Sequence, residues 1–369
     1  MTSSILQAFG EKSAYAPLKE LDGLANAQNI VLLVIDGLGY EYLKKHSKNS
    51  VFEKYLVRDI TSVFPAGTPS AETTLKTGVA PEKHGITGWY VYLKELGVVS
   101  TILPFVPRCG GASFMNYGIE KKEIFTEKTI NEKIKNRSYL IYPDNIAASN
   151  KINAAGVQCL AFADLEGLFA QIKKAIDSSS ERKYIYAYWP EFDMLCHSEG
   201  TEGEKTGEHF KELDRKATYF LDTIRDTNTI LIITADHGLI DTPKSKVIFL
   251  EYHPELQETL ALPLCGQTRT PYCYVRPAKA KDFEKYIKEK LGYCCEAYKG
   301  EDLIKRKFFG LFKPSEKLFD RIGDYVLIMK ENYIIKDKLL KEKIDVFIGN
   351  HGGVSKEEML VPLIIIKNL

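Results

Sequence analysis

Short apolar runs that end in acidic residues are the feature that most constrains the fold of this 369-residue chain. The runs have the length of strands, and most are followed by a polar or glycine turn and a helical pattern; they cover Asn29 to Ile35, Lys183 to Trp189, Thr229 to Thr234 and Met359 to Ile366. Strands that alternate with helices predict an α/β fold with a largely parallel central sheet and helices on both faces.

The acidic residues stand where such a fold binds its ligands. Asp36 directly follows the first run, and Asp193 follows the second run after a short loop. Asp236 and His237 follow the third run. In parallel sheets ligands bind beyond the carboxyl ends of the strands, where loops from different strands converge. We therefore expect these side chains to lie close together.

The chain is long enough for one large core, and no repeat, low-complexity tract or long linker separates independent domains. We expect a single domain over residues 1–369. Residues 90–150 and 245–348 do not follow the strand and helix alternation, so we expect them to be insertions that cap the site. Within the first of these ranges, the Lys- and Glu-rich segment from Lys121 to Asn136 indicates a solvated helix.

The overall charge excludes some classes of partner. The 50 basic residues nearly cancel the 49 acidic ones, so we expect no binding to nucleic acid or to membranes. The first residues lack the pattern of a secretory signal, and no run approaches the length of a membrane-spanning helix. The missing signal pattern favours a cytoplasmic location. Apart from the adjacent Cys294 and Cys295, the seven cysteines are scattered without a C-x-x-C motif, which favours reduced thiols.

Three motifs place histidine near acid or glycine. Asp193 and His197 are four residues apart, so a helix would present both on one face to a metal ion. His237 lies in ADHG, where Gly238 allows the chain to turn, and His351 lies in NHGG. Taken alone, each motif also fits a helix-start acid or a hydrogen-bonded histidine. For His84, in EKHG, we expect a turn-stabilising hydrogen bond and not metal ligation.

A further motif, SVFPAGTPSAETTLKTG, predicts a helix that Thr68 opens, with Pro69 at its first position. A threonine at this position is ordinarily a helix cap. The N-terminus of a helix also stabilises an alkoxide and the phosphoryl oxygens that it attacks. Thr68 can therefore be a cap, a nucleophile or both.

Five ordered blocks between residues 31 and 366 resemble one family. They are VLLVIDGLGY, FPAGTPSAETTLKTGVAPEKHGITG, DMLCH, TADHG and NHGGVSKEEMLVPLII, and they are similar to the type I phosphodiesterase and nucleotide pyrophosphatase family of the alkaline phosphatase superfamily. The resemblance implies hydrolysis of a small phosphate ester, of which a nucleotide is one candidate.

The resemblance also implies the roles of seven residues. One zinc ion would be bound by Asp193, His197 and His351, and a second by Asp36, Asp236 and His237, with Thr68 beside the second as the nucleophile. Attack by Thr68 on phosphorus would give a covalent phosphothreonine, which water then hydrolyses. Manganese or iron also suits such carboxylate and imidazole ligands.

One position departs from the family pattern. Trp89 stands where well-studied diesterases have an asparagine that holds a phosphoryl oxygen, about twenty residues beyond the nucleophile. Trp89 could stack on the substrate or belong to the cap core, and Arg108 is a candidate replacement contact for the anion. A phosphonate C–P hydrolase, a phosphomonoesterase, a phosphomutase and a catalytically silent binding protein remain alternatives, whereas the nucleophile segment lacks the sulfatase pattern.

Overall fold

The centre of the molecule is a largely parallel sheet. The computed structural model describes residues 1–150, 152, 154–343 and 345–368. The strand order is β2-β18-β9-β1-β8-β6-β7. The strands are β1 (Asn29–Ile35), β2 (Leu56–Thr61), β6 (Arg137–Pro143), β7 (Val157–Phe162), β8 (Lys183–Trp189), β9 (Thr229–Thr234) and β18 (Leu360–Asn368). Only β18 runs against the direction of the others among these strands, so the predicted α/β fold is confirmed.

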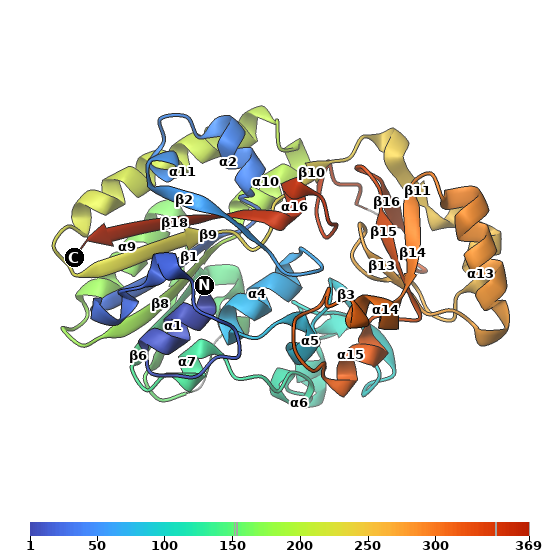
Figure 1. Ribbon diagram of the computed structural model, residues 1–369, viewed down its shortest axis with the longest axis horizontal. Coiled ribbons are helices and arrows are strands. Elements are labelled where there is room, and N and C mark those ends of the chain that lie inside the picture. The colour runs from blue at the N-terminus through green and yellow to red at the C-terminus, as the bar shows by residue number, and fades with distance from the viewer. Residues whose placement is uncertain (151, 153, 344, 369) are drawn as a thin grey trace.

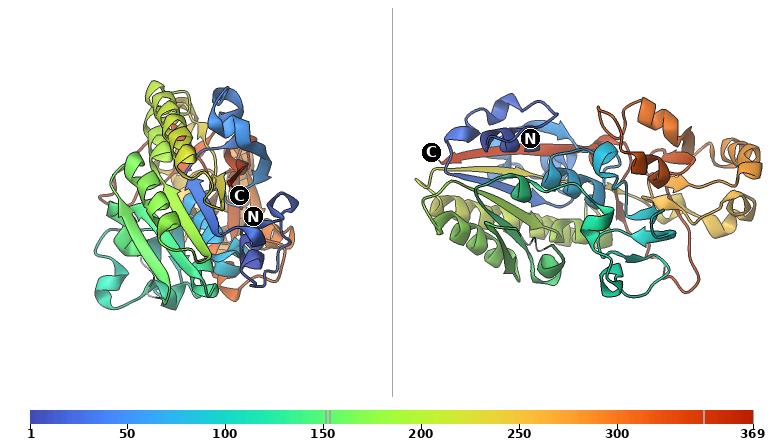
Figure 2. Two further views of the ribbon diagram at one scale, coloured as in Figure 1. Left: turned by 90° about the vertical axis from the view of Figure 1, so that its left-hand side faces the viewer. Right: turned by 90° about the horizontal axis from the view of Figure 1, so that it is seen from below.

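Side chains of β1 explain why helices cover both faces of this sheet. The odd-numbered residues Val31, Leu33 and Ile35 pack into one apolar cluster, and the even-numbered residues between them pack into another. Because both faces of the strand are apolar, each must be shielded from water. Helices α9 (Leu165–Asp177) and α11 (Glu204–Thr223) contribute to the first cluster, and α1 (Thr2–Ala8) contributes to the second (Figure 2).

The remaining helices are short. They are α1 (Thr2–Ala8), α2 (Tyr40–His46), α3 (Val51–Tyr55), α4 (Thr68–Thr77), α5 (Pro81–His84), α6 (Lys121–Ile124), α7 (Ile130–Lys133), α8 (Asp144–Ala147), α10 (Glu191–Glu199), α12 (Pro254–Thr259), α13 (Ala280–Tyr286), α14 (Gly300–Lys305), α15 (Glu316–Arg321) and α16 (Lys356–Met359). Of these, α4 lies at the end of the central sheet that faces the second half of the molecule (Figure 1).

A second sheet lies beside the first (Figure 1). Its order is β14-β15-β13-β12-β3-β4-β5, and its paired strands are antiparallel. The strands are β3 (Tyr90–Leu93), β4 (Val98–Thr101), β5 (Val106–Pro107), β12 (Cys265–Gly266), β13 (Pro271–Cys273), β14 (Cys295–Lys299) and β15 (Tyr325–Met329). Two small ladders pair β10 (Ile240–Asp241) with β17 (Gly349–Asn350) and β11 (Val247–Phe249) with β16 (Ile334–Lys336).

The two ranges expected to be insertions supply every strand of this second sheet. The range 90–150 does more than that, because β6 lies inside it and is a strand of the central sheet. Residues 138–142 of β6 are buried, as a strand covered on both faces must be.

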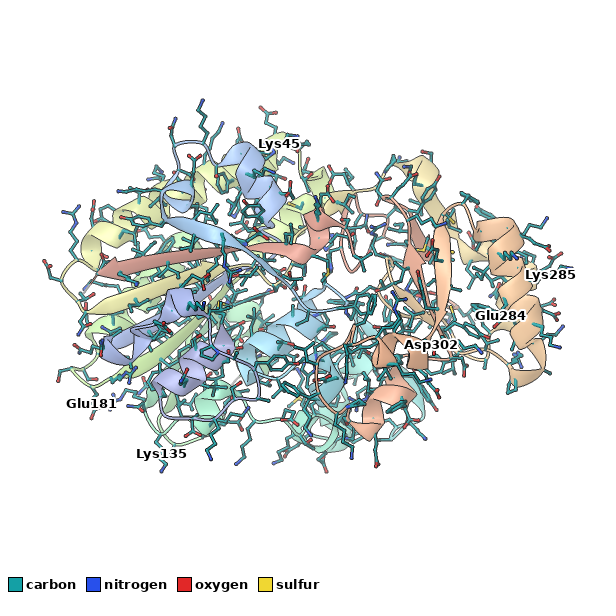
Figure 3. The ribbon with its side chains drawn as sticks, in the orientation of Figure 1. Lys45, Lys135, Glu181, Glu284, Lys285 and Asp302 are labelled. Atoms are coloured by element: carbon teal, nitrogen blue, oxygen red, sulfur yellow. The ribbon has the colours of Figure 1, made fainter. Side chains whose placement is uncertain are left out.

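The Lys121 to Asn136 segment is not one helix. Two reciprocal capping boxes, Glu120 with Glu123 and Thr129 with Glu132, each start a separate short helix, α6 and α7. Charged side chains such as Lys45, Lys135 and Glu181 extend outward from the edge of the molecule (Figure 3). Within the part of the chain that the structure describes, no helix is both long and apolar enough to span a bilayer.

Candidate active site

Three neighbouring strands bring the predicted polar residues together. Strands β9, β1 and β8 are adjacent and parallel, so their carboxyl ends share one edge of the sheet. Asp36 follows β1 directly, and Asp236 with His237 follows β9. Beyond β8, α10 begins and carries Asp193 and His197 one turn apart, as the i, i+4 spacing predicted.

Thr68 is the first residue of α4, with Gly67 as the N-cap. Its side chain makes no capping hydrogen bond; its Oγ1 lies 3.1 Å from Nε2 of His237. The predicted helix start is therefore confirmed, and the threonine side chain is turned toward the histidine instead of the helix. Thr68 lines a cavity of about 1450 Å³ together with Asp36, Asp193 and His351.

Asp36, Asp236 and His237 form one tight group. Their ligand atoms lie within 4.8 Å of one another. Nε2 of His237 is 3.3 Å from Oδ1 of Asp36 and 3.4 Å from Oδ2 of Asp236. The Tyr188 hydroxyl donates to the other oxygen of Asp36, and the backbone N–H of Gly37 donates to Oδ1 of Asp236. These donors hold both carboxylates toward the imidazole.

A second group joins the first through His237. Asp193, His237 and His351 also place ligand atoms within 4.8 Å of one another, and the rings of His237 and His351 stack at 3.8 Å. His197 lies outside this group, yet its Nε2 is 3.1 Å from Oδ2 of Asp193. The structure thus brings together all six residues for which the resemblance implied metal binding.

The three histidines share one hydrogen-bonding pattern. Each places Nδ1 against a backbone carbonyl: His197 at 2.7 Å from Gly349, His237 at 3.1 Å from Gly238, and His351 at 3.3 Å from Ala66. A ring that donates from Nδ1 to a carbonyl presents the lone pair of Nε2 on its other side. This second contact is the usual way in which metal-binding histidines are oriented.

Each of the three aspartates of the site keeps one carboxylate oxygen without a hydrogen-bond donor in the described structure. Oδ1 of Asp36, Oδ1 of Asp193 and Oδ2 of Asp236 are buried without a hydrogen-bond partner in the described structure. Buried carboxylates without partners are costly, and cations are the groups that offset this cost. The donor set of carboxylate oxygens and imidazole nitrogens therefore fits divalent metal ions.

The electrostatics agree with this fit. Burial raises the pKa of Asp36 well above its usual range, and the nearby carboxylates of Asp236 and Asp193 raise it further. Burial also raises the pKa of Asp236. Burial and the neighbouring His237 lower the pKa of His351 well below its usual value. The site thus disfavours the ionised forms of Asp36 and Asp236 and the protonated form of His351, whereas the charge of His197 outweighs burial and lowers the pKa of Asp193. A bound cation would offset the cost of ionising Asp36 and Asp236.

His84 has the structural role expected of it. Its Nδ1 accepts from the backbone N–H of Ile86 at 3.0 Å, and its Nε2 lies 3.0 Å from the hydroxyl of Thr74. Burial, followed by the charge of Arg321, lowers the pKa of His84 to about 3. His84 is therefore a neutral residue at the end of α5, hydrogen-bonded to the turn that follows.

Arg108, the predicted anion contact, lines the same cavity as Thr68 but is already paired with acidic side chains. Its side chain is 2% exposed, and Nη2 lies 2.6 Å from Asp337 and 3.1 Å from Glu342, while the guanidinium stacks on Tyr90 at 4.0 Å. Two carboxylates already match its single charge, so we do not retain Arg108 as an anion contact. Trp89 is 37% exposed and lines the same cavity as Thr68.

Several cavity residues were not foreseen from the sequence. Glu72 and Lys76 lie on α4 one and two turns after Thr68, and their side chains are 3.5 Å apart. The helical spacing from Thr68 could have revealed them. Lys121 reaches the cavity from α6, Gln267 reaches it from the turn between β12 and β13, and Tyr188 reaches Asp36 from β8. No local pattern marks these three.

The fold is that of the alkaline phosphatase superfamily. Carboxylates and imidazoles that could hold metal ions gather at the carboxyl ends of its parallel strands. A sequence model described as type I phosphodiesterase / nucleotide pyrophosphatase matches residues 30–354. The chain belongs to this family.

Individual known proteins that are about one-fifth identical to the chain agree with this assignment. The human ectonucleotide pyrophosphatase/phosphodiesterase family member 5 is 22% identical over 342 residues, which cover 88% of this chain and 66% of that protein. The chain thus spans just under two thirds of that relative's length. The solved structure of its murine counterpart has a TM-score of 0.69 at 21% identity, covering 90% of this chain and 87% of that one.

A second fold neighbour has a different chemistry. Phosphonoacetate hydrolase from Sinorhizobium meliloti 1021, solved with phosphonoacetate, has a TM-score of 0.68 at 18% identity, covering 91% of this chain and 89% of that one. An inactive variant of the murine protein was solved in complex with AMP and has a TM-score of 0.68 at 21% identity, covering 90% of this chain and 87% of that one. These likenesses concern the fold.

Proposed function

We propose that the chain hydrolyses phosphate diesters with Thr68 as nucleophile at a site for two zinc ions. The observation that carries this proposal is the 3.1 Å approach of the Thr68 hydroxyl to Nε2 of His237, which is shared by both groups of ligand atoms. The murine relative gives a second support, because the inactive variant solved with AMP has a threonine replaced by alanine.

The ligand sets follow from the contacts. Asp36, Asp236 and His237 would hold one ion, and Asp193 with His351 the other, completed by His197, which already contacts Asp193. When bound, two divalent ions would lower the pKa of the Thr68 hydroxyl, offset the charge of the phosphoryl group and activate a water molecule. Their four positive charges exceed the three carboxylate charges by one, so the site favours an anion.

Thr68 supplies the attacking oxygen in the proposed reaction. Its oxygen gives up its proton to solvent and attacks phosphorus, and a phosphothreonine forms. The bond to the leaving alcohol breaks with its electron pair on the leaving oxygen, which takes up a proton. Water then attacks phosphorus, the Thr68 ester bond breaks, and the Thr68 oxygen regains a proton. Two successive in-line displacements give net retention at phosphorus. No separate histidine base is needed.

A phosphonate hydrolase is the second candidate. Lys121 and Lys76 line the same cavity as Thr68; burial lowers the pKa of Lys121, and the charge of Lys76 lowers it further. Two ammonium groups near one carboxylate, Glu72, favour a substrate with a second negative group, as phosphonoacetate has. Phosphonoacetate is the ligand of the solved bacterial neighbour.

We also propose that residues 90–150 and 245–348 act as the wall that selects the leaving group, since Trp89, Lys121 and Gln267 line the cavity from these ranges or their edge. A cytoplasmic location remains a proposal, supported by the scattered spacing of the cysteines, which lacks a C-x-x-C motif. Labelling the thiols of freshly isolated protein would test it, because disulfide-bonded cysteines would contradict it.

The function is tested by comparing hydrolysis of bis-p-nitrophenyl phosphate, p-nitrophenyl phosphate and phosphonoacetate by the zinc-loaded wild type and Thr68→Ala, with metal content measured in each. We expect the diester to be cleaved fastest, and the variant to keep its zinc and lose activity. Release of acetate and phosphate from phosphonoacetate at a higher rate would select the second candidate, and an active Thr68→Ala variant would remove Thr68 as nucleophile.

A further inference from the structure

The side chain of Gln267 ends beside the start of helix α4 without a partner. Gln267 is 8% exposed, and its Nε2 is buried with no hydrogen-bond partner in the described structure. A Cβ atom added to Gly67 would lie 2.2 Å from this nitrogen and 3.3 Å from Nδ1 of His351. The amide therefore lies against the residue that precedes Thr68, and it lines the same cavity.

A buried amide without a partner needs an explanation, because leaving such a group unpaired costs about 1–3 kcal/mol. Two glycines, Gly67 and Gly352, make room for Gln267: a Cβ on Gly352 would approach its side chain to 2.6 Å. The side chain is thus placed in a close-fitting slot, although packing alone would be satisfied by an apolar residue of similar size.

The turn that carries Gln267 is rigid. The backbone groups of Gln267 and Thr270 exchange hydrogen bonds of 3.2 and 3.1 Å, and the Thr270 hydroxyl donates to the carbonyl of Gly352 at 2.8 Å. On the other side, Gly266 pairs with Tyr90, which brings Gln267 next to Trp89 at the end of the two strands. These contacts hold the backbone of Gln267 in place, so the side chain extends from a defined position.

The N-terminus of α4 offers a second donor at the same place. The backbone N–H of Thr68 has no acceptor within the helix, whereas those of Ser70 and Ala71 donate to the carbonyl of Gly67. An anion at this end of the helix would meet an N–H group, the helix dipole and the amide of Gln267 together.

We infer that the Gln267 amide donates a hydrogen bond to a non-bridging oxygen of the phosphoryl group that Thr68 attacks. This inference rests on the proposed function, from which the position of the phosphoryl group beside Thr68 follows. Gln267 would then be a substrate-binding residue supplied by the second sheet, and the otherwise unpaired nitrogen would gain its partner when substrate binds.

The test is titration of inorganic phosphate into the zinc-loaded chain, with the Thr68→Ala background used so that no covalent step contributes. We expect Gln267→Ala and the isosteric Gln267→Glu to weaken phosphate binding about 10- to 100-fold, with unchanged zinc content. Gln257→Ala, which removes an exposed glutamine from α12, is the matched control and should bind phosphate like its parent.

A second measurement is hydrolysis of the diester by Gln267→Ala and Gln267→Glu made in the wild-type background, which keeps Thr68. We expect kcat/KM to fall by a similar factor. Unchanged phosphate affinity in both variants would overturn the inference, and so would loss of zinc in parallel with loss of phosphate binding. If the wild type cleaves no ester but Gln267→Ala still weakens phosphate binding, the proposed function fails and the phosphate contact stands. If the Gln267 variants hydrolyse the diester normally and bind phosphate like their parent, the proposed function stands and the phosphate contact fails.

Discussion

Arg269 and Glu358 form an ion pair that is closed to solvent. Nη2 lies 2.7 Å from Oε2 and Nε lies 3.0 Å from Oε1, and the two side chains are 1% and 0% exposed. Arg269 belongs to the turn of Gln267, while Glu358 accepts from the N–H of Gly353, two residues after His351. This pair therefore joins the second sheet to the histidine loop of the central sheet.

Removing one member of the pair is expected to destabilise the protein strongly. Arg269→Met leaves Glu358 buried without its cation, which costs about 3–5 kcal/mol. Urea unfolding measures the change in the free energy of unfolding. The double variant Arg269→Met with Glu358→Leu should recover part of the loss, and Arg225→Met, which removes an exposed ion pair with Asp222, should change little. Equal effects of Arg269→Met and Arg225→Met would show that the buried pair does not link the sheets.

Tyr188 is expected to tune the metal site through Asp36. Its hydroxyl donates to a carboxylate oxygen, and Tyr188→Phe removes this second contact while keeping the ring. Loss of such a partner weakens metal affinity about 10- to 100-fold. Tyr184→Phe on the same strand is the control, because its buried hydroxyl has no hydrogen-bond partner in the described structure. Competition with a coloured chelator measures both affinities, and identical values for the two variants would contradict this role.

His84 should make stability depend on pH. Its pKa falls from 6.5 in the unfolded chain to about 3 in the folded one, so between these values the unfolded state binds one more proton. Folding is therefore weakened as pH falls below 6.5, by about 1.4 kcal/mol per pH unit and by about 2 kcal/mol at pH 5. His84→Asn should remove this contribution. The check is urea unfolding of both chelator-treated proteins at pH 7, 6 and 5; parallel pH profiles would argue against it.

Gly67→Ala tests the slot that holds Gln267. The backbone at Gly67 is extended, with φ −152° and ψ 152°, so alanine is not strained there. Its Cβ would instead lie 2.2 Å from the amide nitrogen. Such overpacking costs about 1–3 kcal/mol. In the Gln267→Ala background the clash disappears, so the same substitution should cost less. Additive losses in the double variant would mean that the two side chains do not meet.

The sequence predicted the parts of the site that local patterns encode. Asp36 and Asp236 follow apolar strands, and the shared direction of those strands brings them together. Thr68 was placed at a helix start by the proline that follows it. These inferences needed no knowledge of distant contacts.

Other features depend on residues far apart in the chain. The ion pairs of Arg108 with Asp337 and Glu342 join positions more than 220 residues apart, and no sequence pattern around Arg108 predicts them. The antiparallel direction of β18 and the approach of Gln267 to Gly67 likewise arise from tertiary packing. For this reason the substrate-facing wall was less predictable than the metal ligands.

The phosphothreonine is the most direct test of the mechanism. Zinc-loaded wild type is mixed with excess bis-p-nitrophenyl phosphate, quenched in acid within the first turnover, digested and analysed by peptide mass spectrometry. We predict a phosphoryl group on Thr68 that is absent from Thr68→Ala and from chelator-treated protein. Diester cleavage in which the first turnover leaves Thr68 unmodified, with Thr68→Ala equally active, would contradict a covalent mechanism at this residue.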